Sequence, residues 1–196
     1  MKKNIIKKMA LASVMAAFAI VLNLISVRSD TSLYTIYALP LLLAGILYGP
    51  LVGFYAGLAT GIIVQLFTYG ITPTTVLWVL APTAWGLISG FISYLFSYKI
   101  TKPKVIINIA ICTLSVLILN TLAQILDGLY YQYSTAFVWI NIHIRVLVSI
   151  VIGIFYIVVI YLTAPRLKKI TNVNDINTKQ PVEKKSKLKV NLTIEK

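Results

Sequence analysis

The sequence has few of the residues that most catalytic sites require. Its 196 residues include one cysteine, one histidine and five acidic residues. The lone Cys112 excludes a disulfide within the chain and a cysteine-rich metal site. With His143 as its only histidine, the chain cannot form a His-Glu-x-x-His zinc motif. From these absences we expect that the chain is not an enzyme and that it uses neither a metal nor a cofactor.

Charged residues are also scarce, at 12% of the sequence, whereas hydrophobic residues make up 59% and the mean hydropathy is +0.88. A soluble domain of this size cannot bury so much apolar surface, so the chain is expected to lie in a membrane. Six apolar runs of about membrane-spanning length predict an all-α, multi-pass bundle of six transmembrane helices. These runs cover residues 5–27, 34–49, 51–68, 74–97, 105–126 and 141–164.

The net charge is +13, and basic residues gather in three groups at the ends of the apolar runs. One group, at residues 2–8, lies at the start of the first run, one joins the fourth and fifth runs at 99–104, and one follows the sixth at 166–169. Six spans place all three groups on one side, which the positive-inside rule assigns to the cytoplasm together with both termini. Topology and anionic lipid account for this charge, so no nucleic-acid partner is expected. The predicted domains are a membrane domain at residues 1–169 and a disordered basic tail at residues 170–196.

Glycines recur at every fourth residue from Gly45 to Gly61. This spacing places small residues on one face of a helix, where a second helix can approach closely. Pro50, directly after Gly49, interrupts the series and predicts two helices joined by a very tight turn. Ordinary packing between membrane helices is an alternative explanation for the glycines.

Polar residues in the last two apolar runs fall on helical faces. Asn120, Gln124 and Asp127 share one face, and Asn141 and Arg145 share another. At a rise of about 1.5 Å per residue, Asn120 and Arg145 both lie about 10 Å below the outer surface. An arginine at that depth normally faces the bundle interior or a water-filled cavity. Arg145 is therefore expected either to bind an acidic group of a ligand or to pair with Asp127 for structure.

Residues of other apolar runs reach the same outer half of the bundle. Aromatic walls, amide side chains and one guanidinium there would form an outward-open pocket for a small, flat, partly anionic molecule. Trp85 is expected to pack in the core or to form the floor of this pocket. The predicted substrate-binding residues are Tyr37, Gln65, Trp78, Asn120, Gln124 and Arg145.

Ala12 and Ala16 in the first run form an Ala-x-x-x-Ala face suited to close helix contact, within the chain or with a partner. Residues 43–53 add the run Leu-Ala-Gly-x-x-x-Gly-Pro-x-x-Gly. Through these motifs and its six short spans, the chain over residues 8–165 resembles the substrate-binding (S) component of an energy-coupling factor (ECF) vitamin transporter. The resemblance implies a bacterial plasma-membrane protein that binds a small-molecule vitamin and passes it to a membrane scaffold subunit driven by two cytoplasmic ATPases. It also implies that Ala12 and Ala16 contact the scaffold.

Within that superfamily the chain resembles the folate branch most, through residues 119–122 (Leu-Asn-Thr-Leu) and Arg145 early in the sixth run. It departs from that branch at residues 33–37, which carry no basic residue, and at residues 70–73, which read Gly-Ile-Thr-Pro. Folate is the expected vitamin, with pantothenate or a pyrimidine precursor as alternatives. A small membrane enzyme of lipid metabolism and a structural membrane adaptor are the alternatives from other functional classes.

Overall fold

The computed structural model describes residues 2–25, 27–28, 33–34 and 36–170. The helices are α1 (Lys2–Leu24), α2 (Ala38–Tyr48), α3 (Pro50–Thr68), α4 (Thr75–Leu95), α5 (Lys102–Tyr130) and α6 (Thr135–Ile170). Two short antiparallel strands, β1 (Val27–Arg28) and β2 (Leu33–Tyr34), precede α2, with Val27 opposite Tyr34 and Arg28 opposite Leu33. The predicted all-α class is confirmed apart from this strand pair. Of the predicted tail, Ile170 belongs to α6, and residues 171–196 lie outside the described part of the chain.

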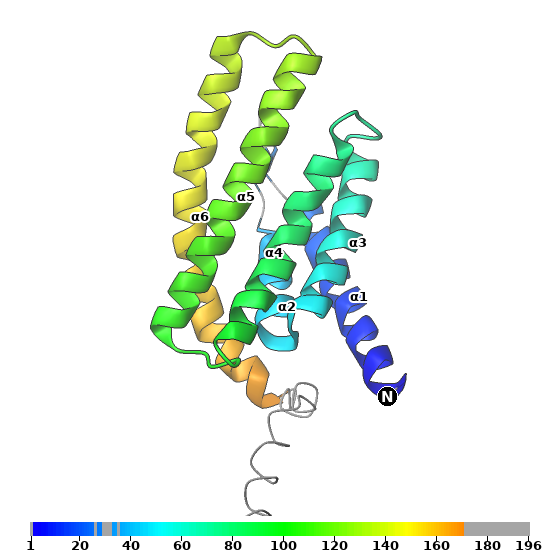
Figure 1. Ribbon diagram of the computed structural model, residues 1–196, viewed down its shortest axis with the longest axis vertical. Helices are drawn as coiled ribbons and strands as arrows, with labels where there is room; N and C mark the ends of the chain where they lie inside the picture. Colours follow the sequence, from blue (N-terminus) through cyan, green and yellow to red (C-terminus); the bar gives the residue numbers. More distant parts are fainter. Residues whose placement is uncertain (1, 26, 29–32, 35, 171–196) are drawn as a thin grey trace, which may run out of the picture.

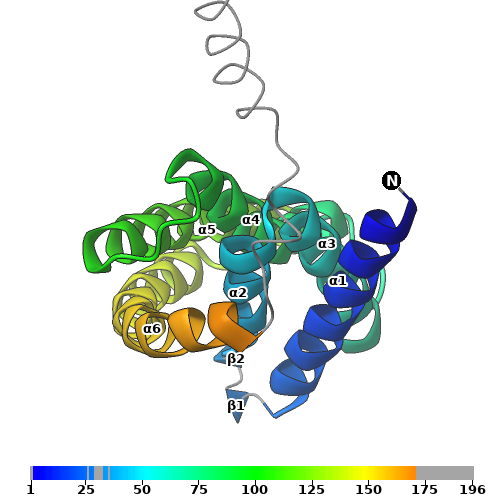
Figure 2. The same ribbon diagram turned by 90° about the horizontal axis from the view of Figure 1, so that it is seen from below.

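The helices form one bundle in which α3 and α4 lie side by side and α5 and α6 form a long pair (Figure 1). The view along the bundle shows α2 enclosed by the other helices (Figure 2). The start of α1, the loop between α4 and α5 and the end of α6 gather at one end, which we call the basic end. The α3–α4 and α5–α6 loops lie at the opposite end. The three basic groups therefore share one end, and its exposure to the cytoplasm stays a prediction.

Of the second predicted span, residues 34–49, the structure has only Ala38–Tyr48 as a helix. Five helices are long and apolar enough to cross a membrane, and the chain is a multi-pass membrane protein. The helix α2 has only 11 residues, or about 16 Å of length, against a hydrocarbon core of about 30 Å. Almost every residue of α2 is buried within the bundle. A helix buried on all sides and a helix facing lipid are both apolar all round, so composition alone cannot separate them.

The break between α2 and α3 falls at Gly49, as predicted. Gly49 has a φ of 95°, in the region that L-residues rarely adopt, and its N–H donates to the carbonyl of Gly45. Pro50 begins α3, where its missing N–H costs no helical hydrogen bond. The two helices therefore follow one another without an intervening loop.

The predicted close approach on the glycine face occurs between α3 and α4. Gly53 of α3 lies directly against Gly86 of α4, backbone to backbone. One turn farther along α3, a Cβ atom added to Gly57 would stand 2.5 Å from the carbonyl oxygen of Pro82. After another turn, a Cβ at Gly61 would stand 2.8 Å from the carbonyl oxygen of Val79. Both distances are shorter than real Cβ contacts, so this interface accepts only glycine at these positions.

The core lies where α2 meets α4 and α6. Trp85 packs edge-on against Tyr156 with ring centroids 5.7 Å apart, and both are buried. Of the two predicted places for Trp85, the core is therefore the correct one. Cys112 is also fully buried and forms no disulfide, and its thiol donates to Oδ1 of Asn108 at 3.5 Å. This contact between Trp85 and Tyr156 packs α6 against α4.

Candidate ligand-binding site

The charge at the centre of the candidate site is Arg145, half-buried on α6. Its Nη1 donates to the backbone carbonyl of Asn120 at 2.8 Å, and its Nη2 donates to Oε1 of Gln124 at 3.2 Å. The guanidinium also stands over the ring of Trp78, 5.4 Å from its centroid. Arg145 thus links α6 to both α4 and α5 by two hydrogen bonds and a cation–π contact.

Asp127 anchors the same cluster at the end of α5. Its carboxylate accepts one hydrogen bond from the hydroxyl of Thr74 and one from the indole N–H of Trp78, the latter at 2.9 Å. Trp78 therefore presents its edge to a carboxylate and its face to a guanidinium. Because neutral donors on α4 occupy both oxygens of Asp127, the carboxylate helps to orient the indole ring beneath Arg145.

The structure confirms the predicted register of α5 and α6. Asn120, Gln124, Trp78 and Arg145 meet at one level, as a rise of about 1.5 Å per residue required. Asn120 accepts the hydrogen bond from Arg145 through its backbone carbonyl and not through its side chain. A helical carbonyl can accept a second hydrogen bond through its other lone pair, and helix periodicity cannot reveal this use.

Tyr37 and Gln65 border the cluster from other elements. Tyr37, just before α2, lies near enough to Arg145 and Tyr69 for its hydroxyl to interact electrostatically with both. Gln65 is 5% exposed and lies near the end of α3, one turn beyond the contact of Gly61 with Val79 on α4. The contacts of the cluster therefore come from α4, α5, α6 and the residue before α2, and Gln65 lies buried near the end of α3.

The sequence analysis missed Thr74. Thr74 is buried just before α4, and the neighbouring hydroxyls of Thr72 and Thr75 contact one another and the backbone of this turn. The signal was the Thr-Pro-Thr-Thr run at residues 72–75, which is typical of a helix start. Its hydrogen bond to an acid 53 residues away follows only from the fold.

His143 lies two residues before Arg145 on α6, and it is exposed and faces away from the cluster. Its Nδ1 lies 2.7 Å from the carbonyl oxygen of Trp139, one turn earlier in the same helix. This is the backbone interaction expected of an interfacial histidine. Within the described residues, no three His, Cys, Asp or Glu side chains gather to form a potential metal site.

Ala12 and Ala16, the predicted partner contact, lie on the inner face of α1. Each is 4% exposed, and α1 packs against α3 and α2. Ala17, next along the chain, is exposed instead. The structure therefore supports the intramolecular alternative for the Ala-x-x-x-Ala face, and the contact with a scaffold stays a prediction.

Comparisons with known proteins agree with this architecture. Residues 1–130 match the family model 5TM-5TMR_LYT, described as the 5TMR of 5TMR-LYT. The chain belongs to this family. The match ends at Tyr130, the last residue of α5, so Arg145 lies on the helix that follows the matched region of this 5TM-5TMR_LYT member. No curated protein sequence matches the chain.

Two solved structures share the fold of this 5TM-5TMR_LYT member. One is the crystal structure of FolT bound with folic acid, which is 20% identical, with a TM-score of 0.57 over 81% of this chain and 93% of FolT. The other is the S component of a bacterial ECF transporter, which is 22% identical, with a TM-score of 0.59 over 83% of this chain and 98% of the other. The predicted resemblance to S components is thus confirmed at the level of the fold.

The chemistry of the cluster suits a flat, anionic ligand. A guanidinium offers five N–H donors in a planar fork that matches a carboxylate. The acceptors that Arg145 now uses on α5 are neutral, so a ligand carboxylate would be a stronger acceptor than either. Trp78, Tyr37 and Tyr69 supply aromatic surface beside the charge. The arrangement is suited to binding.

Proposed function

We propose that the chain is the substrate-binding S component of an ECF-type vitamin importer, a binding protein and not an enzyme. In this proposal it lies in a bacterial plasma membrane with both termini in the cytoplasm. It binds a small acidic vitamin at the Arg145 cluster and delivers it through a membrane scaffold subunit powered by two ATPases. The observation that carries the proposal is a half-buried guanidinium, stacked on Trp78 and held by neutral acceptors, inside the fold of S components.

Folate is the proposed substrate, with pantothenate and a pyrimidine precursor as the alternatives. Folic acid combines a flat ring system with carboxylates, which fits an aromatic wall beside one guanidinium. The crystal structure of FolT bound with folic acid, which shares this fold, adds support. Arg145 would hold a carboxylate, Gln124 and Gln65 would donate or accept hydrogen bonds, and Trp78 and Tyr37 would contact the flat part.

Substitution of Arg145 tests this proposal. A charge-assisted hydrogen bond contributes about 1.5–3 kcal/mol, so Arg145→Gln should weaken binding of folic acid at least about tenfold. The affinity of Arg145→Lys for folic acid should fall between those of the parent chain and Arg145→Gln, because lysine keeps the charge and loses the planar fork. Equilibrium dialysis with labelled folic acid gives the affinity, and a thermal melt in detergent reports folding.

Arg166→Gln is the matched control, because Arg166 is exposed at the other end of the same helix. It should bind folic acid as well as the parent chain. A folded Arg145→Gln protein with unchanged affinity would remove Arg145 from the site. If pantothenate or a pyrimidine precursor binds in place of folic acid with the same dependence on Arg145, the site stands and the vitamin changes.

The Ala-x-x-x-Ala face calls for a separate test of coupling to a scaffold. Ala16→Leu overpacks the contact of α1 with α2 and α3 if the face serves the fold, and it should then lower the melting temperature and vitamin binding together. Loss of uptake in cells with binding and stability intact would instead support the scaffold contact. Ala17→Leu adds the same bulk at an exposed position and is the control.

A further inference from the structure

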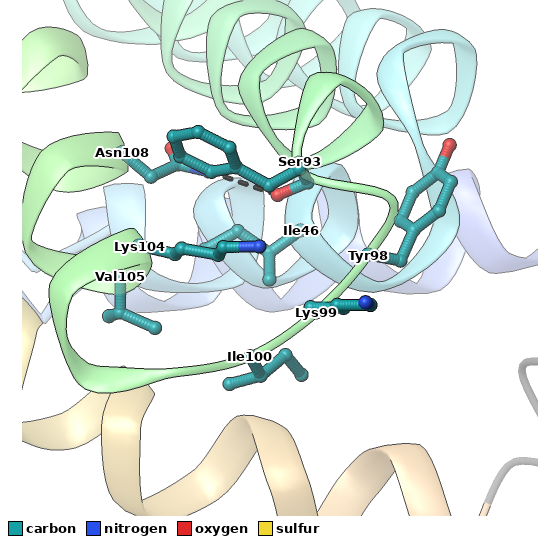
Figure 3. Close-up of a pocket in the computed structure, with 9 residues that line it drawn as sticks. Ile46, Ser93, Tyr98, Lys99, Ile100, Lys104, Val105 and Asn108 are labelled. Atoms are coloured by element: carbon teal, nitrogen blue, oxygen red, sulfur yellow. Dashed lines mark hydrogen bonds between the residues drawn. The ribbon is translucent and has the colours of Figure 1, made fainter.

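A second place where charge and shape coincide lies at the basic end, away from the Arg145 cluster. A hollow opens there between the α4–α5 loop, the first turns of α5 and the end of α2 (Figure 3). The volume in which the centre of a water molecule can lie is about 10 Å³. That is room for about one water or one phosphate oxygen. The residues that line it are Ile46, Ser93, Phe96, Tyr98, Lys99, Ile100, Lys104, Val105 and Asn108.

Four lysines lie at this end of the bundle, and two of them line the hollow. Lys99 and Lys104 line it directly. The Nζ of Lys104 stands 5.3 Å from the centroid of Phe96, and that of Lys102 stands 5.5 Å from the centroid of Tyr161. Lys168 of α6 donates to the backbone carbonyl of Tyr98 at 2.9 Å. Three of these ammonium groups are thus paired with aromatic rings or a carbonyl, which leave their positive charge unneutralised.

No carboxylate in the described part of the chain balances these lysines. Asp127 is the one acidic residue among the described residues, and it lies toward the opposite end of the bundle. Residues 171–196 contain three acidic residues and six lysines, a net charge of +3 from 6 − 3. The tail therefore adds positive charge overall. No described residue neutralises the basic end, and this favours an anion from outside the chain.

The loop that carries Lys99 is held in a defined shape. Ser97 and Tyr98 adopt positive φ angles of 53° and 54°, and the N–H of Tyr98 donates to the carbonyl of Ser93 at 2.8 Å. The bond from Lys168 fixes the carbonyl of Tyr98 from the other side. Conformations of this kind persist only where the surroundings stabilise them. The position of Lys99 beside Lys104 is therefore set before any ligand arrives.

We propose that this lysine-lined hollow binds the phosphate group of an anionic phospholipid. The hollow admits one phosphate oxygen and leaves the rest of the headgroup at the rim among the lysines. The flanking helix surfaces are apolar and exposed, as acyl chains require: Leu95 is 61% exposed, Ile106 47% and Leu162 56%. A basic pocket between helices at the membrane surface is suited to an anionic headgroup. The proposal does not depend on the ligand of the Arg145 cluster.

The test is native mass spectrometry of the full chain titrated with phosphatidylglycerol or with phosphatidylcholine of the same acyl chains. We expect the parent chain to prefer phosphatidylglycerol. Each lysine near the headgroup should contribute about fivefold to this preference. Lys99→Gln/Lys104→Gln should therefore abolish most of it, whereas Lys99→Arg/Lys104→Arg should retain it. Lys7→Gln/Lys8→Gln removes the same charge from α1 and should keep the preference.

Three results would overturn the proposal. Equal binding of the two lipids by the parent chain excludes a headgroup site. Equal loss in the Lys7→Gln/Lys8→Gln control assigns the preference to net charge alone. Full displacement of phosphatidylglycerol by excess inorganic phosphate, with phosphate itself retained on the chain, makes the hollow a site for free anions. Lys99→Gln alone, at an exposed position, decides the matter if the double variant fails to fold.

Discussion

The two helix pairs of the bundle are held together in different ways. Helices α3 and α4 meet backbone to backbone at Gly53 and Gly86. Helices α5 and α6 meet through Arg145, Gln124 and a backbone carbonyl. Within an 18-residue apolar stretch of each helix, 56% of the stretch in α4 is buried inside the bundle, against 17% of the stretch in α6. The α3–α4 pair therefore forms a closely packed wall, whereas the α5–α6 pair is joined by polar contacts, at which we propose that a ligand binds.

The largest expected effect is a loss of stability from disrupting the α3–α4 contact. Gly53→Ala places a Cβ in contact with the backbone of Gly86, so one helix must shift. We expect a loss of stability of about 3 kcal/mol or more. Gly153→Ala makes the same chemical change in α6, where the nearest atom is Oγ1 of Thr113 at 3.6 Å. This control should be neutral or gain about 0.5–1 kcal/mol from helix propensity. Equal melting temperatures for the two variants would refute the contrast.

A smaller effect is expected where the two pairs are joined. Asn108 of α5 donates from Nδ2 to the carbonyl of Ser89 and to the hydroxyl of Ser93 on α4, both at 2.9 Å. Asn108→Ala removes both bonds at a buried position and should cost about 2 kcal/mol. Ser115→Ala on the same helix loses only a bond to its own preceding turn and should change stability by less than about 0.5 kcal/mol. Chemical denaturation in detergent micelles measures both, and a neutral Asn108→Ala would show that α5 is held mainly by apolar packing.

The smallest effect concerns the orientation of Trp78. Asp127→Asn weakens the hydrogen bonds from Thr74 and Trp78 and should cost about 1–2 kcal/mol of stability. Affinity for folic acid should fall less than in Arg145→Gln, because Asp127 acts through the indole. If Asp127→Asn equals Arg145→Gln in both measurements, the two residues act as one structural pair. That pair was the alternative that the sequence left open.

Much of the fold was predictable because membrane helices can be identified from their apolar composition. The break at Gly49 and Pro50, the glycine contact and the shared level of Asn120 and Arg145 all follow from helix geometry. The shortness of α2 did not, because an apolar helix inside protein and one inside lipid have the same composition. The inward orientation of Ala12 and Ala16 was equally hidden, since exposed small residues such as Ala17 occur on the same helix.

The candidate site was predictable in its residues but not in its bonds. Helix geometry placed Arg145 at the same depth as Asn120. The acceptor on Asn120 is nevertheless a backbone atom, which no sequence pattern indicates. Thr74 and Asp127 are 53 residues apart and meet only because α4 and α5 pack together. The hollow at the basic end also forms between segments that are distant in the sequence. From the sequence, its lysines indicated only the orientation of the chain in the membrane. Contacts between distant segments are what sequence periodicity leaves out.

The most direct test of the proposed function is to identify what the protein carries when it is purified from its membrane. Native mass spectrometry of the intact chain, from cells supplied with folic acid, reports any bound small molecule by mass. We expect one acidic vitamin bound per chain in the parent protein and in Arg166→Gln, and none on folded Arg145→Gln. A folded parent chain that carries no small molecule and takes up no acidic vitamin when one is added would contradict the proposed function.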